Sequence, residues 1–181
     1  MRILVAVVLL VSLSACGLTA PRSSEGFADL DSLGVMDTDR VMNLSIGPTL
    51  LHFAANHVDD EPETRELLRS LDGVRMRIYE IDGDADRVAG RMQAMSAKLQ
   101  QDGWEPVLLV RDQAEQVHML LRMLDGQIRG MTVLVCDGAT EAVVINLMGT
   151  IQPDQFNSVM MALDVDAPGV DEIRVAPAQE S

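Results

Sequence analysis

Apolar and polar residues alternate most regularly in the last third of the chain. Segments 128–136 and 142–148 are both rich in β-branched residues, and successive side chains of an extended strand point to opposite faces. Asp137 and Gly138 stand between the two segments, and this pair tolerates the positive φ of a two-residue turn. The pattern therefore predicts a β-hairpin, with the rest of the domain arranged around it.

Four more segments have the alternation and composition of β-strands. They are 41–46, 74–81, 106–111 and 115–124. Short polar turns connect the last two segments to each other and to the hairpin. The chain from 106 to 148 is therefore predicted to form a four-strand antiparallel meander.

Helical periodicity marks the segments between and after these strands. Pro48 and Pro62 suit the first position of two short helices. A longer helix is expected between Asp84 or Asp86, either of which is a suitable N-cap, and Gly103. The stripe on this helix consists of Val88, Met92, Met95 and Leu99. A closing helix is predicted from Pro153, with Phe156, Val159, Met160 and Leu163 on one face.

The resulting order of elements, β-α-α-β-α-β-β-β-β-α, predicts an α+β domain over residues 41–163. We expect a two-layer sandwich: one mixed sheet of about six strands, with the helices on one face.

The N-terminus has the features of a secretory signal. Arg2 precedes an apolar run over residues 3–11, which is too short to span a bilayer, and small residues follow. Residues 13–16, Leu-Ser-Ala-Cys, resemble the lipobox of bacterial lipoproteins. The resemblance implies cleavage after residue 15 and acylation of Cys16; the alternative is an ordinary cleaved signal followed by a chance cysteine.

The resemblance to lipoproteins also implies a location. Gly17, in place of an aspartate that would retain the protein at the inner membrane, implies the periplasmic face of the outer membrane in a Gram-negative host. The membrane is then a partner through the N-terminal lipid. Residues 16–40 are rich in Ser, Gly and Asp and predict a lipidated flexible tether, and 164–181 predict an acidic flexible tail.

Composition excludes one large class of function. The formal net charge is −14, and the chain has one Trp, one Tyr and three Phe. Neither the basic surface nor the aromatic platforms that bind nucleic acids are present. With Cys16 acylated, Cys136 would have no second cysteine, so no internal disulfide is expected.

Methionine and histidine suggest one metal site. Met92, Met95, His118, Met119 and Met123 supply the soft ligands that Cu(I) prefers. Met92 and Met95, however, lie on the apolar stripe of the long helix, where methionine commonly fills a core. We therefore expect no metal and no cofactor, and keep a soft-metal binding protein as the alternative.

No catalytic motif is visible. The chain has no His-Glu-x-x-His, no Gly-x-Ser-x-Gly and no glycine-rich phosphate loop. Cys136 beside a histidine would be a nucleophile pair, but a cysteine on a strand is usually a buried, inert residue. The chain is expected not to be an enzyme, with a small hydrolase-like enzyme as the alternative.

The candidate binding face is basic. Arg75, Arg77 and Tyr79 take alternate positions of one strand and must share a side of the sheet. If exposed, they form a positive surface where an acidic partner segment or an anionic ligand docks. The alternative is a solvated face with acidic partners across the strands.

Several of these segments also resemble a known family. Residues 71–79, Gly103, Trp104, 126–135 and 144–149 resemble the bacterial domain of unknown function four-two-five-two. The resemblance implies a small secreted lipoprotein with no assigned activity and no catalytic residues to carry over. Some members are encoded beside alternative sigma factors and their membrane-bound regulators. The expected function is a lipid-anchored periplasmic binding or regulatory module in envelope signalling, with an envelope protein as partner.

Overall fold

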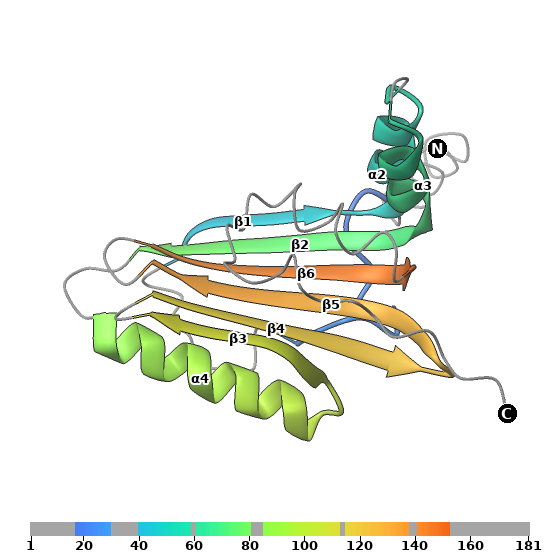
Figure 1. Ribbon diagram of the computed structural model, residues 1–181. Coiled ribbons are helices and arrows are strands. Elements are labelled where there is room, and N and C mark those ends of the chain that lie inside the picture. The colour runs from blue at the N-terminus through green and yellow to red at the C-terminus, as the bar shows by residue number, and fades with distance from the viewer. Residues whose placement is uncertain are drawn as a thin grey trace, which may run out of the picture.

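The computed structural model describes residues 17–29, 40–58, 61–80, 85–112, 115–137 and 141–152. The predicted signal peptide, Cys16, the predicted helix from Pro153 and the predicted tail lie outside these residues. The elements, in chain order, are β1 (Arg40–Ile46), α2 (Pro48–Ala55), α3 (Pro62–Ser70), β2 (Leu71–Glu80), α4 (Ala85–Gln101), β3 (Glu105–Asp112), β4 (Glu115–Leu124), β5 (Gln127–Cys136) and β6 (Glu141–Ile151) (Figure 1). The predicted α+β class is confirmed.

The six strands form one open sheet in the order β1-β2-β6-β5-β4-β3, and the predicted meander from β3 to β6 is confirmed. Every neighbouring pair is antiparallel, so the prediction of a mixed sheet was wrong. The helical connection through α4 is the reason for the difference. β2 and β3 run in the same direction, but β6, β5 and β4 lie between them, so no parallel pair forms.

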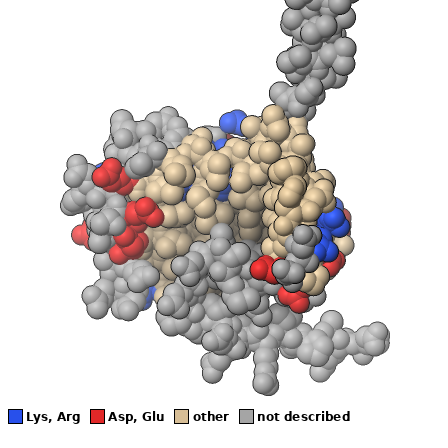
Figure 2. Space-filling model, turned by 90° about the horizontal axis from the view of Figure 1, so that it is seen from above, with Lys and Arg blue, Asp and Glu red and all other residues tan. Residues whose placement is uncertain are grey.

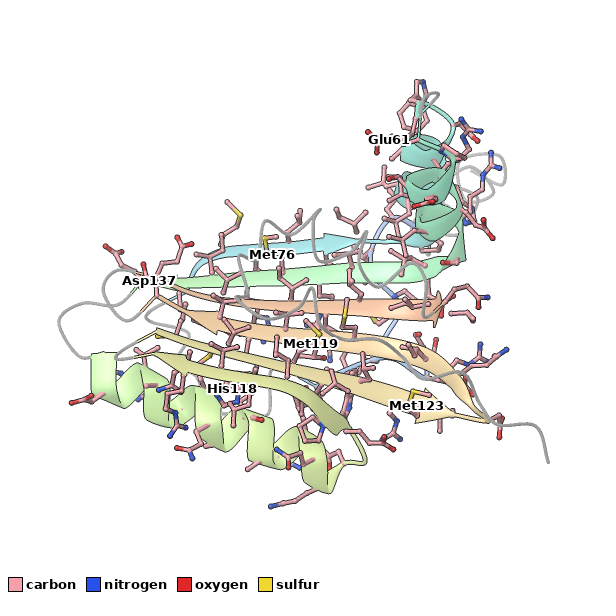
Figure 3. All side chains as sticks on the ribbon, in the orientation of Figure 1. Glu61, Met76, His118, Met119, Met123 and Asp137 are labelled. Carbon is pink, nitrogen blue, oxygen red and sulfur yellow. The ribbon has the colours of Figure 1, made fainter. Side chains whose placement is uncertain are left out.

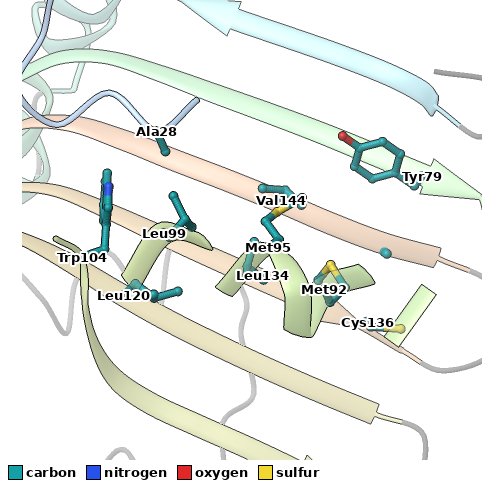
Figure 4. Packing of buried hydrophobic residues seen from close by; sticks show 11 residues of the cluster. Ala28, Tyr79, Met92, Met95, Leu99, Trp104, Leu120, Leu134, Cys136 and Val144 are labelled. Atoms are coloured by element: carbon teal, nitrogen blue, oxygen red, sulfur yellow. The ribbon is translucent and has the colours of Figure 1, made fainter. Parts of the chain in front are cut away.

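The helices pack on both faces of the sheet, although the sequence predicted one face. Met92, Met95 and Leu99 of α4 pack against Leu120 and Leu134 on the face that we call the α4 face (Figure 4). On the opposite face, Leu51 of α2 and Leu67 of α3 join a second apolar cluster. Both faces accept a helix because β6 places apolar side chains on both, Val144 on one and Ile145 on the other.

The rest of the α4 face is crossed by residues 17–29, which we call the strap. Asn146 of β6 is fully buried and holds the strap at two backbone groups. Its Oδ1 accepts a hydrogen bond from Ala28 N at 3.0 Å, and its Nδ2 donates one to Gly26 O at 3.0 Å. Gly26 lies so close to the backbone of Gly130 that neither residue has room for a Cβ. Where it is described, the predicted flexible tether is therefore packed against the domain.

Two Asp-Gly pairs give different turns. Asp125 and Gly126 have φ of 51° and 74°, and Leu124 pairs with Gln127, so this is a two-residue turn. Asp137 and Gly138 were predicted to form the same turn, but Cys136 pairs with Ala142 and the connection is longer. The Asp137 side chain accepts a hydrogen bond from Glu141 N at 2.9 Å, which stabilises the longer connection.

Candidate functional site

A hollow of about 410 Å³ lies between the strap and the adjoining strands β1 and β2. Two of the residues that line it are arginines, and most of the others are small or polar. The lining residues are Thr19, Ala20, Pro21, Arg22, Asn43, Ser45 and Arg75. Ser45 fixes one side of the hollow, because its Oγ accepts a hydrogen bond from Ala20 N at 3.1 Å. The hollow therefore exists only because the strap is docked on β1.

Arg75 is held in place by the strap. Its Nη1 donates to Ala28 O at 3.4 Å, and its guanidinium lies over the ring of Phe27, 4.9 Å from the ring centroid. A planar guanidinium that is stacked on an aromatic ring loses little freedom when it binds a planar anion. Arg75 thus contributes an oriented positive charge to the wall of the hollow.

The three residues of the predicted binding face have the predicted arrangement on the strand but not the predicted exposure. Arg75, Arg77 and Tyr79 do share one side of β2, opposite Val74 and Met76. The expectation that they are exposed was wrong, since their exposed fractions are 6%, 2% and 4%. The strap and α4 cover this side of the sheet, and Tyr79 belongs to the apolar cluster under α4.

Arg22 was missed in the sequence analysis. It is exposed on the strap and lines the same hollow as Arg75. A sequence signal did exist, because Arg22 is the one charged residue between positions 17 and 24 in a strongly acidic chain. It was overlooked because the segment was interpreted as a flexible tether.

A second hollow, of about 290 Å³, lies on the other side of the strap. Its charged and polar side chains already bind one another. Arg129 Nε lies 2.9 Å from Glu25 Oε2, and Arg129 Nη1 donates to Thr150 Oγ1 at 2.6 Å. Ser24 Oγ donates to Asp72 Oδ2 at 2.9 Å. Glu25 and Thr150 therefore bind the guanidinium group of Arg129 within the hollow.

The predicted copper ligands are divided between the two faces of the sheet. Met92 and Met95 lie in the core under α4. Met119 and Met123 belong to the opposite face, while His118, one residue before Met119 on β4, points toward the α4 side (Figure 3). The five residues therefore do not form one site. No group of three or more His, Cys, Asp or Glu in the described ranges is placed to hold a metal ion.

His118 remains an unusual residue on the α4 side. It is 5% exposed, and within the described structure its Nε2 has no hydrogen-bond partner. Burial lowers the pKa of His118, and the positive charge of Arg111 lowers it further. The imidazole is therefore favoured in its neutral form, which is the form that binds metals.

Cys136 lies near His118 in the register of the sheet. Cys136 pairs with Gln116, and Leu134, two residues earlier, pairs with His118. Cys136 is fully buried and is not in a disulfide. A thiol in this position has no surface that a substrate can reach, which argues against its use as a nucleophile.

The burial of Cys136 gives a direct prediction. In a Cys16→Ala variant, which retains one of the two cysteines of the chain, a thiol reagent should label native protein more than about 100-fold more slowly than unfolded protein. The reagent can reach the Cys136 thiol only in molecules in which the core under α4 has transiently opened. The rate of reaction with a chromogenic disulfide measures this, and equally rapid labelling of native protein would contradict the burial.

In the part of the chain that the structure describes, no helix combines the length and the apolar character needed to cross a membrane. The family model for a domain of unknown function, DUF4252, matches residues 35–159. No curated protein and no solved structure matches the chain.

Proposed function

This chain belongs to the DUF4252 family, whose domain has no known function, so we propose a function on the basis of the residues that line its surface hollows. The protein is a non-enzymatic binding or regulatory module of the bacterial envelope. A lipid on Cys16 anchors it to the periplasmic face of the outer membrane. Its partner is an envelope protein, and envelope signalling is the process that it serves.

The observation that supports this proposal is the pair of arginines in the 410 Å³ hollow. Arg22 and Arg75 bring two guanidinium groups to one concave surface on a molecule with a net charge of −14. Guanidinium groups bind carboxylates with two parallel hydrogen bonds. The ligand that fits is a carboxylate of an acidic segment in the partner.

Of the three residues of the predicted binding face, we place only Arg75 in the binding site, together with Arg22. Arg77 and Tyr79 are buried on the same side of β2 and do not line the hollow. Asn43, which is exposed on β1, and Thr19 on the strap add polar groups to the rim of the hollow.

Replacing Arg22 by glutamate tests the binding site. Arg22 is exposed, so Arg22→Glu should change the free energy of unfolding by no more than about 0.5 kcal/mol. Binding of a polyglutamate peptide, measured by calorimetry at low salt, should weaken by about tenfold or more, because an attractive charge becomes a repulsive one.

Arg111→Glu is the matched control. Arg111 is also exposed, but it lies on β3, at the opposite edge of the sheet from β1. The same change of charge there should leave peptide binding nearly unchanged. An equal loss in both variants would mean that only the overall charge matters, and a wild-type protein that does not bind the peptide would refute the site.

A soft-metal site is the second candidate, supported by His118. Met92, Met95, His118 and Cys136 all belong to the α4 side of the sheet, and Cu(I) prefers thioether, thiolate and imidazole ligands. Uptake of one Cu(I) per chain by the purified protein, lost in His118→Leu, would favour this alternative over the anion site.

A further inference from the structure

The surface around the start of α2 differs in charge from the rest of the chain. Residues 41–58, which include α2 and most of β1, contain no Asp, Glu, Lys or Arg. The first acidic residue of the strap is Glu25. The whole chain has 28 acidic residues, so a stretch of this length without one is a marked local exception. Figure 2 shows this kind of contrast on the molecule as a whole: a broad uncharged surface has acidic and basic groups at its sides.

Three large apolar side chains are exposed on this surface. The exposed fractions are 46% for Leu18, 44% for Leu50 and 63% for Phe53. Leu50 and Phe53 are three residues apart on α2 and therefore share a face of the helix. The buried residues of the same helix, Leu51 and Ala55, point into the domain. We call Leu18, Leu50 and Phe53 the α2 surface.

The first residues of the strap, Gly17 and Leu18, lie beside the start of α2. Leu18 O accepts a hydrogen bond at 2.8 Å from the N–H of Gly47, the residue before α2. Gly17 lies so close to Thr49, near the start of α2, that a Cβ on Gly17 would collide with the Thr49 hydroxyl. Cys16 is the next residue, and consecutive Cα atoms are about 3.8 Å apart. A lipid on Cys16 therefore leaves the protein beside the α2 surface.

We propose that the α2 surface docks on the lipid bilayer, with Leu18, Leu50 and Phe53 inserted in its interface. This inference rests on the proposed acylation of Cys16. Because the strap packs against the domain, no flexible tether separates the acyl chains from α2. The anchor therefore keeps the α2 surface close to the bilayer, at a high effective concentration relative to the lipid. Apolar side chains bind the interface, and Leu18, Leu50 and Phe53 themselves carry no charge that an anionic membrane would repel.

The test uses full-length, acylated protein in vesicles of phosphatidylethanolamine and phosphatidylglycerol. Phe53→Cys is labelled with an environment-sensitive fluorophore; Cys136 is buried and Cys16 carries the lipid, so neither competes for the label. The expected result is a blue-shifted emission that nitroxide-bearing lipids quench at least twofold. Leu109→Cys is the matched control, since Leu109 is 60% exposed but lies on β3 at the far edge of the sheet. Its label should remain unquenched.

Mass spectrometry and co-sedimentation with the vesicles separate the two proposals. Protein that carries no lipid and does not sediment would refute the proposed anchoring. Protein that is acylated and sediments, with labels at positions 53 and 109 equally unquenched, would refute the docking alone. A blue shift at position 53 that appears without vesicles and rises with protein concentration would show a second copy on the α2 surface and also overturn the docking.

Discussion

Replacing Asn146 by leucine should lower the free energy of unfolding by about 3 kcal/mol, since buried polar groups that lose their partner cost about 1–3 kcal/mol each. The groups that would lose their partner are Ala28 N and Gly26 O, each of which is hydrogen-bonded to the Asn146 side chain at 3.0 Å. A leucine of similar size fills the space but pairs with neither group. Thermal or denaturant unfolding of the purified protein measures the change, and the melting temperature should fall by roughly 10 °C.

Asn43→Leu provides the comparison for Asn146→Leu. Asn43 is exposed on β1, so the same substitution should change stability by no more than about 0.5 kcal/mol. The Asn146 variant should also expose the strap to limited proteolysis before the rest of the domain unfolds. Equal stability of the two variants would mean that the docking of the strap on the sheet does not depend on the Asn146 side chain.

Replacing Cys16 by alanine should abolish palmitate labelling of the protein completely. One acyl chain binds a bilayer only marginally, whereas two or more hold a protein firmly, so the loss of every chain leaves no lipid anchor. The α2 surface alone should bind too weakly to survive washing. Metabolic labelling with palmitate and fractionation of the envelope measure the result, and the variant should be unlabelled and either soluble or unprocessed.

Cys136→Ala is the natural control for Cys16→Ala, because it removes the other cysteine of the chain. Its labelling and its fractionation should match those of the wild type. If the wild-type protein itself carries no lipid, the proposed location at the outer membrane fails, and so does the docking of the α2 surface that depends on it.

The alternation of residues predicted which side chains share a face, but not what covers that face. In β2 it correctly grouped Arg75, Arg77 and Tyr79. Their burial depends on the strap and on α4, and the contact of the strap with β6 comes from residues that are 118 positions apart in sequence. A local pattern contains no information about a contact of this range. The same limit explains why the strap was interpreted as a tether and why Arg22 was overlooked.

The turns show the same limit on a smaller scale. Asp125 and Gly126 form the two-residue turn that the dipeptide favours, whereas the pairing of Cys136 with Ala142 leaves a longer connection between β5 and β6. The dipeptide is the same in both places. What differs is the register of the flanking strands, which the side chains of the whole sheet determine. The alternation therefore predicted the existence of both hairpins, but the two-residue turn that was predicted at Asp137 and Gly138 was wrong.

The contact between the strap and β6 also fixes an order of events. The chain is synthesised from its N-terminus, so Gly26 and Ala28 emerge well before Asn146, their partner 120 and 118 residues later. Until β6 has formed, Ser45 and Arg75 are available to the strap, but Gly26 O and Ala28 N lack their partner. If the chain is cleaved before Cys16 and acylated there, as we propose, the enzymes responsible can act before this contact forms. Once the strap has docked, Gly17, the residue that follows Cys16, lies against Thr49 of α2.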